Sequence, residues 1–251
     1  MKNAGNNIQW EVSEDKQNWK ELPGENMESL VIHVDSSAYY RARILKSNTC
    51  PFYSDTILIA EIYDERTGQQ YDGVQMGPYF WMAENLNFYT PTGSYFYHND
   101  SVNYSAFGRL YKWQIAQNVC MDRWHLPSDK EWFELEMSVG LSVSQVLLSE
   151  WRGTDQAFKL FPGGSSGFNV QFGGQKYPEG FYQDVINIGT YWTSSSYSDL
   201  EAWYRGFNTA HGDIHRYYYS KDFGFSVRCV KNRAQKLRSV HYMPYPIHQF
   251  L

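Results

Sequence analysis

Leu126-Pro127-Ser128-Asp129-Lys130-Glu131 is the stretch that bears most directly on the fold, because it marks the start of a helix. Ser128 followed by Glu131 three positions later forms a capping box, in which each side chain satisfies a free backbone N–H at the helix start. Gly140 is a suitable stop for this helix. Upstream, residues 107–120 place Leu110, Trp113, Ala116 and Val119 at helical spacing, which predicts a second, amphipathic helix.

Short strands follow these helices along the chain. A shorter helical pattern covers about 143–151, and strand-like segments occupy 190–195, 201–207, 213–218 and 223–230. Helices followed by short strands predict an α+β domain over residues 63–232. The aromatic side chains that we assign to its core are Tyr191, Trp192, Phe207, Phe223 and Phe225.

The N-terminal residues 1–62 have a different pattern. Short alternating strands are separated by turn residues such as Pro23-Gly24, which predicts a small all-β unit. This unit resembles bacterial immunoglobulin-like domains through Gln9-Trp10, Asn18-Trp19-Lys20-Glu21-Leu22-Pro23-Gly24 and Tyr39-Tyr40-Arg41. In those domains the Trp strand is the third, yet only nine residues precede Trp10 here. Because an incomplete sandwich exposes an edge, we expect this unit to contact the second domain, another copy or a partner chain.

The C-terminal tail, residues 233–251, is basic and rich in proline and aromatic residues. Residues 231–251 contain four Lys and Arg and no acidic residue. Two interpretations stay open: a solvated extension, or a strap or oligomerisation arm that uses the apolar segment Tyr242-Met243-Pro244-Tyr245-Pro246-Ile247.

Composition excludes several classes of protein. A net charge of -5 argues against nucleic-acid binding, and no segment has the roughly 18 uninterrupted apolar residues that a membrane helix needs. The first residues contain no apolar signal-peptide region. The three cysteines are too few for a disulfide scaffold, although Cys120 and Cys229 could form one bond.

A series of local motifs over about residues 63–232 resembles the Fibrobacter succinogenes major paralogous domain family. The motifs occur in this order: Trp81-Met82-Ala83-Glu84-Asn85-Leu86-Asn87, Gly108-Arg109-Leu110-Tyr111-Lys112-Trp113, Asn118-Val119-Cys120, Trp124-His125-Leu126-Pro127-Ser128-Asp129, Tyr191-Trp192-Thr193-Ser194-Ser195 and Gly224-Phe225-Ser226-Val227-Arg228-Cys229-Val230-Lys231. The resemblance implies a C-type lectin-like fold with two main helices and short antiparallel strands. It also implies a disulfide between Cys120 on the first helix and Cys229 on the last strand, with two buried free thiols as the alternative. Cys50 would stay unpaired.

Catalytic and metal-binding motifs are weak in this sequence. Formylglycine-generating enzymes share the broad fold but use a pair of cysteines near the C-terminal end, where only Cys229 occurs. His211 and His215 have a zinc-like spacing, but on a strand that spacing separates them by about 13 Å. The lectin triplets that bind calcium are absent, although Asp199, Glu201 and Asp213 leave room for a structural calcium ion. We therefore predict no enzyme activity, no cofactor and no metal site.

Tyrosine is concentrated near the end of the second domain. Eight of the 21 tyrosines lie within residues 177–219, among small and polar residues typical of recognition surfaces. The opposing interpretation is that half of them pack between strands. The residues that we predict for an exposed ligand-binding face are Tyr197, Tyr204, Asn208, His211, Asp213, His215, Tyr217 and Tyr219.

These observations predict a noncatalytic module that binds a carbohydrate or protein ligand through this face. The resemblance places it on a bacterial surface or in a virion, in adhesion or receptor binding. It also implies a face varied by a diversity-generating retroelement, because lectin-like targets of such elements vary the stretch before a Gly-Phe-Ser-Val-Arg string, here residues 224–228. The alternative is a structural or assembly protein in which the incomplete β unit and the tail contact partners.

Overall fold

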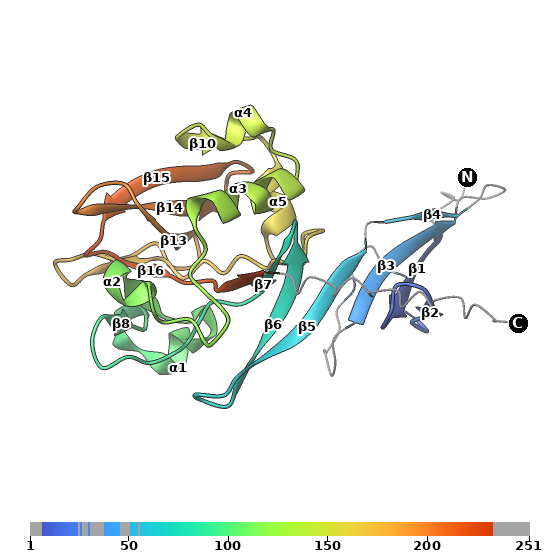
Figure 1. The fold of residues 1–251 in the computed structure, drawn as a ribbon, viewed down its shortest axis with the longest axis horizontal. Coiled ribbons are helices and arrows are strands. Elements are labelled where there is room, and N and C mark those ends of the chain that lie inside the picture. Colours follow the sequence, from blue (N-terminus) through green and yellow to red (C-terminus); the bar gives the residue numbers. More distant parts are fainter. Residues whose placement is uncertain are drawn as a thin grey trace, which may run out of the picture.

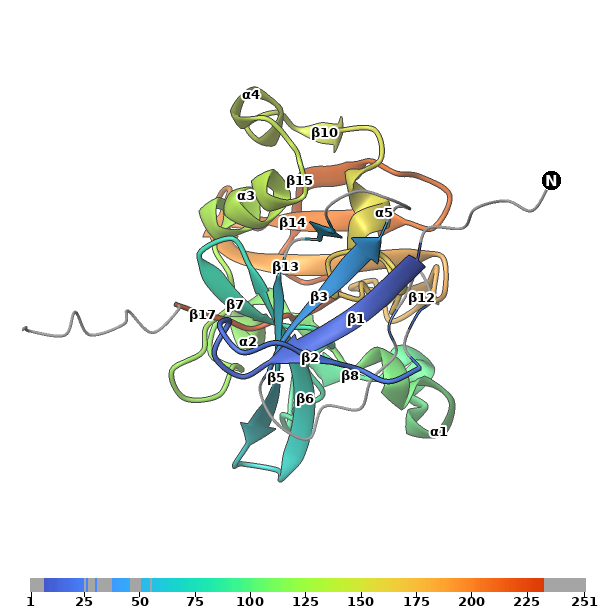
Figure 2. The same cartoon turned by 90° about the vertical axis from the view of Figure 1, so that its right-hand side faces the viewer.

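The computed structural model describes residues 7–24, 26, 30, 38–45, 51–54 and 56–232. Strands dominate it, with 37% of residues in strands and 16% in helices, and they form two large sheets (Figures 1 and 2). The predicted α+β, C-type lectin-like fold with two main helices is therefore wrong. Predictions for Cys50 and for the tail 233–251 lie outside the described residues.

The first sheet joins the N-terminal strands to the second predicted domain. Its order is β17-β7-β6-β5-β3-β1-β2, with β4 paired to β3 and every pairing antiparallel. The strands are β1 (Asn7–Ser13), β2 (Lys20–Glu21), β3 (Ala38–Leu45), β4 (Phe52–Tyr53), β5 (Ile57–Asp64), β6 (Gln69–Met76), β7 (Tyr79–Met82) and β17 (Val230–Asn232). The predicted boundary at 62–63 falls inside β5. The structure thus does not confirm a separate immunoglobulin-like sandwich.

The second sheet is built mainly from the C-terminal half of the chain. Its order is β10-β15-β14-β13-β16-β11-β12, with β9 paired to β16 and β8 to β9. Most pairings are antiparallel, while β13 and β16 run parallel. The strands are β8 (Ser94–Tyr95), β9 (Leu110–Lys112), β10 (Glu150–Arg152), β11 (Gln175–Lys176), β12 (Tyr182–Gln183), β13 (Ile188–Ser196), β14 (Glu201–Asn208), β15 (Ile214–Ser220) and β16 (Gly224–Ser226).

The helices are short and lie around the second sheet (Figure 1). They are η1 (Tyr97–Asn99), α1 (Ser101–Tyr104), η2 (Ser105–Phe107), α2 (Trp113–Ala116), α3 (Asp129–Ser138), α4 (Val143–Val146) and α5 (Gln156–Leu160). The capping box at the start of α3 is confirmed, since Ser128 Oγ accepts from the Glu131 N–H and Glu131 accepts from the Ser128 N–H.

The helix predicted over 107–120 is mostly wrong. Leu110–Lys112 form strand β9, and only Trp113–Ala116 are α-helical. Leu110 pairs with Ser226 and Tyr111 with Phe225 on β16. Pairing with a strand more than 100 residues away has overridden the local helical period, because a buried strand satisfies its backbone and side chains together.

Two buried clusters fill the interior. In one, Trp132 of α3 packs against Trp81 of β7 with ring centroids 5.0 Å apart, and Phe168, Tyr191 and Phe207 complete it. The other contains Trp192 and Phe225, whose rings lie 4.2 Å apart, together with Phe223 and Cys229. The aromatic residues that we assigned to the core are therefore buried, as predicted.

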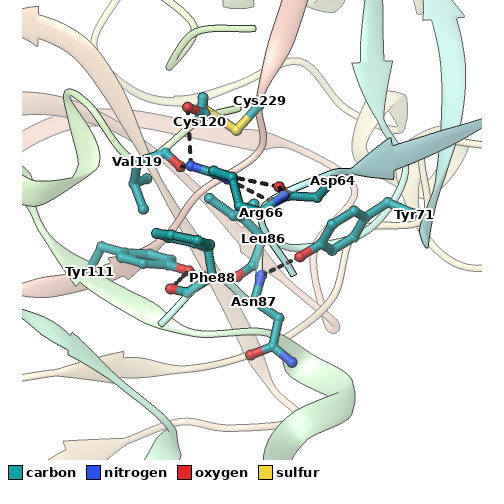
Figure 3. Close-up of a disulfide and its surroundings, with 10 residues drawn as sticks. All are labelled: Asp64, Arg66, Tyr71, Leu86, Asn87, Phe88, Tyr111, Val119, Cys120 and Cys229. Atoms are coloured by element: carbon teal, nitrogen blue, oxygen red, sulfur yellow. Dashed lines mark hydrogen bonds and ion pairs between the residues drawn. A yellow bond between two sulfur atoms is a disulfide. The ribbon is translucent and has the colours of Figure 1, made fainter. Parts of the chain in front are cut away.

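A disulfide joins Cys120, which follows α2, to Cys229, which precedes β17, as the family resemblance implied (Figure 3). The cross-link closes a loop with a sequence separation of 109 residues. In the chain-entropy model a loop of this size stabilises the fold by about 4–5 kcal/mol, by restricting the unfolded chain.

Arg66, in the turn between β5 and β6, ties the first sheet to this cross-linked segment (Figure 3). Its guanidinium forms two bonds with the Asp64 carboxylate and donates to the carbonyl of Val119 at 2.9 Å. It also lies over the Phe88 ring at 3.8 Å. Burial alone would raise the pKa of Asp64, but the bonds from Arg66 outweigh burial and keep that pKa below its ordinary value. Asp64 therefore stays charged and keeps Arg66 in place. Arg66 in turn holds the β5–β6 turn against Val119.

Candidate functional site

The predicted binding face lies on β14 and β15, where cross-strand neighbours share one side of the second sheet. Tyr204 is opposite Tyr217, Ala202 is opposite Tyr219, and Gly206 is opposite His215. Side chains directly opposite each other in an antiparallel pair point the same way. Tyr204, Tyr217, Tyr219 and His215 thus come together.

The eight predicted residues differ in how accessible they are. Tyr204 is buried among the core aromatics, and its ring lies 5.0 Å from that of Phe225. Asn208 accepts the Ala210 N–H and so holds the turn after β14. Tyr219 is 38% exposed and packs edge-on against Phe223. The other five, Tyr197, His211, Asp213, His215 and Tyr217, lie along or beside the outer edge of β15.

Six rings stack one after another along this edge, and we call them the aromatic ladder. In order they are His211, Trp151, His215, Tyr217, Tyr218 and Tyr197. Successive centroids are 5.3, 4.6, 5.9, 4.4 and 3.6 Å apart, with interplanar angles of 23, 36, 23, 16 and 3°. Trp203 adds an edge-on contact to both Tyr197 and Tyr218. The ladder connects residues from β10, β15, the β13–β14 turn and the turn before β15.

Tyr217 and Tyr218 of the ladder lie on the stretch of β15 beyond its pairing with β10. Strand β10 pairs only with Ile214, His215 and Arg216, so the rest of β15 has a strand partner on one side only within the described residues. Tyr217 and Tyr218 are adjacent, and adjacent strand residues normally point to opposite faces. Their centroid separation of 4.4 Å requires both rings to lean over the outer edge. Rings therefore cover the backbone N–H and C=O groups of that edge.

His215 occupies the middle of the ladder and is fixed by two polar contacts. Its Nδ1 lies 3.1 Å from the Tyr204 hydroxyl, and its Nε2 lies 3.1 Å from a carboxylate oxygen of Glu150. Burial lowers the pKa of His215 below its ordinary value, although Glu150 opposes this effect. Burial likewise raises the pKa of Tyr204 far above the usual value. The ring of His215 is thus held neutral and in one orientation.

A buried ion network lies behind the ladder. Glu136 of α3 bonds Arg152 of β10 and Arg205 of β14, and all three side chains are fully buried. Asp129 bonds Arg205 and Arg216 of β15, each at 2.7 Å. Burial would raise the pKa of Asp129, but Arg216 and Arg205 together hold it below its ordinary value. The network anchors β10, β14 and β15 to α3 and so positions Trp151, which directly precedes Arg152.

The surface around the ladder is partly apolar. Trp151 is 44% exposed and Tyr197 is 48% exposed. Leu147 and Leu148, whose carbonyls accept from Arg216, and Leu200, next to Tyr197 in the β13–β14 turn, are also exposed. Exposed apolar groups gathered in one area are a mark of an interaction site.

Sequence reasoning missed Trp151 and Tyr218. Trp151 was included in the helical pattern 143–151, whereas the structure ends α4 at Val146 and places Trp151 on β10. Strict alternation along residues 213–219 predicts Tyr218 on the face opposite Tyr217, so the predicted binding face omits it. The run Tyr217-Tyr218-Tyr219 was the available signal, because three consecutive tyrosines on an edge strand cannot all enter the core.

Other chemistry is not assembled in the described part of the chain. His125 lies 2.6 Å from Glu131, whose hydrogen bond raises the pKa of His125, and this pair belongs to the α3 cap. No group of three or more His, Cys, Asp or Glu side chains among the described residues could hold a metal ion. Nor does any helix there have the length and apolar character needed to cross a membrane.

Comparison with known proteins identifies one family. A family model described as the Fibrobacter succinogenes major domain matches residues 74–231. The match begins in β6 and ends in β17, and it therefore includes all residues of the aromatic ladder and both bonded cysteines. Searches of curated proteins and of solved structures find no match.

Proposed function

The chain belongs to the Fibrobacter succinogenes major domain family, and we propose that it is a noncatalytic binding module whose aromatic ladder contacts a carbohydrate or protein ligand. The observation that carries the proposal is the row of six neighbouring rings that runs from β10 along β15 to the β13–β14 turn. Tyr and Trp rings provide large, rigid contact surfaces at low entropic cost. Stacking on one another and packing around His215 removes most of their freedom before a ligand arrives, which favours binding.

A location outside the reducing cytosol, on a cell surface or in a virion, is part of this proposal. It is supported by the Cys120–Cys229 disulfide, because such bonds persist mainly in oxidising compartments. Adhesion or receptor binding would be the corresponding role.

Assembly with partner chains is the second candidate function. The supporting observation is that β1–β4 lie at the far end of the first sheet from the helices and from β13–β15 (Figure 1). Strand β2 has only two residues and pairs with Glu11 and Val12 alone, so it shields little of β1. A partner strand could extend the sheet at that edge.

One experiment separates the two candidates. Wild-type protein and the double variant Trp151→Ala/Tyr197→Ala are screened on glycan and protein arrays, and their oligomeric state is measured by light scattering after size exclusion. We expect the double variant to lose array binding and to keep the oligomeric state. The matched control is Tyr63→Ala/Tyr89→Ala, which removes two similarly exposed rings elsewhere.

Unchanged array binding by Trp151→Ala/Tyr197→Ala would rule out the ladder as the ligand site. A stable oligomer whose array binding does not depend on the ladder would favour assembly through the β1 edge instead.

A further inference from the structure

This protein frequently places its own cations over its aromatic rings, and the ladder is different. Arg41 lies 3.9 Å from the Trp19 ring and 4.1 Å from the Tyr53 ring. Arg109 covers Phe96 at 3.8 Å, and Lys221 covers Trp113 at 4.4 Å. Within the described part of the chain, no Lys or Arg lies over any of the six ladder rings. The parts of these rings that are exposed to solvent therefore keep the negative potential that attracts a cation.

Carboxylates border the ladder along its length. Glu150 contacts His215 and its side chain is 63% exposed. Asp213 lies 3.8 Å from His211 at one end. Near the other end, the Tyr197 N–H donates to the carbonyl of Glu201, and Asp199 is exposed in the same turn. The border therefore carries negative charge next to both exposed terminal regions.

The chain's own cations on neighbouring elements are already bonded. Arg152 bonds Glu136, and Arg216 bonds Asp129. Lys221 donates to the carbonyls of Ser198 and Asp199 at 2.8 and 3.0 Å. Arg216 also lies over the Trp203 ring at 3.7 Å, and Trp203 contacts Tyr197 and Tyr218 edge-on, so this cation faces a ring beside the ladder and none of the six ladder rings.

We infer that the ladder binds a protein partner through Arg side chains of an exposed segment, which stack on the free face of Tyr197 at the end of the ladder, contact the exposed part of Trp151 and pair with Glu150 and Glu201. This inference rests on the proposed function and names the class of ligand. A guanidinium is planar and stacks on aromatic rings while it bonds carboxylates, so it matches both features. The exposed Leu147, Leu148 and Leu200 beside the ladder favour a protein surface, which adds apolar contacts around the cation, over a small free cation.

The test measures fluorescence anisotropy of a labelled ten-residue Arg/Gly peptide at several salt concentrations, with a Glu/Gly peptide and free arginine as comparison ligands. The variant Glu150→Gln/Glu201→Gln removes two carboxylates at the ladder. Its matched control, Glu14→Gln/Glu179→Gln, removes the same charge at exposed sites elsewhere. We expect roughly tenfold weaker Arg/Gly binding for the ladder variant, and at most twofold for the control.

Variants that lack ladder rings give an independent test of the inference. Trp151→Ala/Tyr197→Ala should weaken Arg/Gly binding by roughly tenfold, and Tyr63→Ala/Tyr89→Ala should leave it unchanged. Circular dichroism of each variant verifies that the fold is kept, and Trp151→Phe, which retains a ring, should restore most of the binding lost with Trp151→Ala.

Equal weakening by the two charge variants would overturn the inference, because it would reflect net charge alone. So would Arg/Gly binding that is insensitive to ring removal, or free arginine binding as tightly as the peptide. Ladder-dependent binding to an uncharged glycan would overturn the inference while the proposed function stands. Array binding that does not depend on the ladder would instead overturn the proposed function.

Discussion

In the N-terminal strands the Arg41 guanidinium lies between the rings of Trp19 and Tyr53, whereas along β15 rings stack directly on rings. Arg41 also bonds Glu11, so the N-terminal aromatic group has its cation and its counter-charge within one chain. The ladder has carboxylates nearby but no cation on its rings in the described residues. Rings lie on the surface in both regions, but among the described residues those of the ladder have no cation of the chain over them.

The two regions also differ in how deeply their ion pairs are buried. At the ladder they are buried behind the strands, where Glu136, Arg152 and Arg205 have no exposed side-chain surface. In the N-terminal strands the pair between Arg43 and Glu21 is open to solvent, with the Glu21 side chain 56% exposed. The rings that face outward at the ladder are thus supported by charges that face inward.

Of the substitutions considered, Glu136→Gln should cause the largest loss of unfolding free energy. It leaves Arg152 and Arg205 buried without their main counter-charge, and breaking a buried pair in this way costs about 3–5 kcal/mol. Glu21→Gln breaks an exposed pair and should cost at most about 1 kcal/mol. Urea unfolding of both variants measures the two free energies.

A cost for Glu136→Gln as small as that for Glu21→Gln would contradict the view that the buried network holds β10 and β14 on α3. Glu136→Leu serves as a second variant, because it too removes the counter-charge that Arg152 and Arg205 share, and it cannot form an amide hydrogen bond.

The local parts of this contrast could be predicted from sequence. The Ser128–Glu131 cap depends on neighbours within four residues, and β14 and β15 alternate clearly enough to be assigned. Four of the six ladder rings, Tyr197, His211, His215 and Tyr217, belonged to the predicted binding face. Local hydrogen bonding and period-two alternation are properties of short segments, so one sequence contains them.

The non-local parts could not be predicted. Trp151 reaches the ladder only because β10 pairs with β15, more than 60 residues later, and its own segment has a helical pattern. Leu110–Lys112 become a strand for the same reason, through pairing with β16. Neither the merger of β5 and β6 into one sheet nor the share of strand in the fold follows from periodicity, since both depend on which strands meet. The fold-class prediction was wrong for this reason.

The pH dependence of stability should distinguish the ladder from the α3 cap. Burial holds the pKa of His215 below its ordinary value of 6.5, despite Glu150 and Asp213, so His215 contributes stability that is present above pH 6.5 and is lost as pH falls. The bond to Glu131 raises the pKa of His125 above 6.5, so its contribution is present below pH 6.5 and is lost as pH rises through the raised pKa. Thermal unfolding between pH 5 and 8 checks the two slopes.

Two variants isolate these slopes. His215→Gln should reduce the loss of stability on acidification below pH 6.5, and His125→Gln should reduce the loss on the alkaline side. Asp129 does not interfere, because its lowered pKa confines its effect to pH values below 3.8. Slopes of the same sign for both histidines would contradict the burial of His215 within the ladder.

The smallest expected effect concerns the exposed rings themselves. Tyr197→Ala removes the outermost ladder ring, and because that ring is 48% exposed we expect a loss of only about 0.5 kcal/mol of unfolding free energy. Trp19→Ala removes one side of the Arg41 contact and the indole hydrogen bond to the Lys16 carbonyl, and should cost about 1–2 kcal/mol. Urea unfolding shows which of the two variants loses more unfolding free energy. If Tyr197→Ala were the more costly, the ladder would serve to protect the β15 edge. The expected order would show that this ring contributes little to folding, which agrees with the proposal that the ladder serves ligand binding.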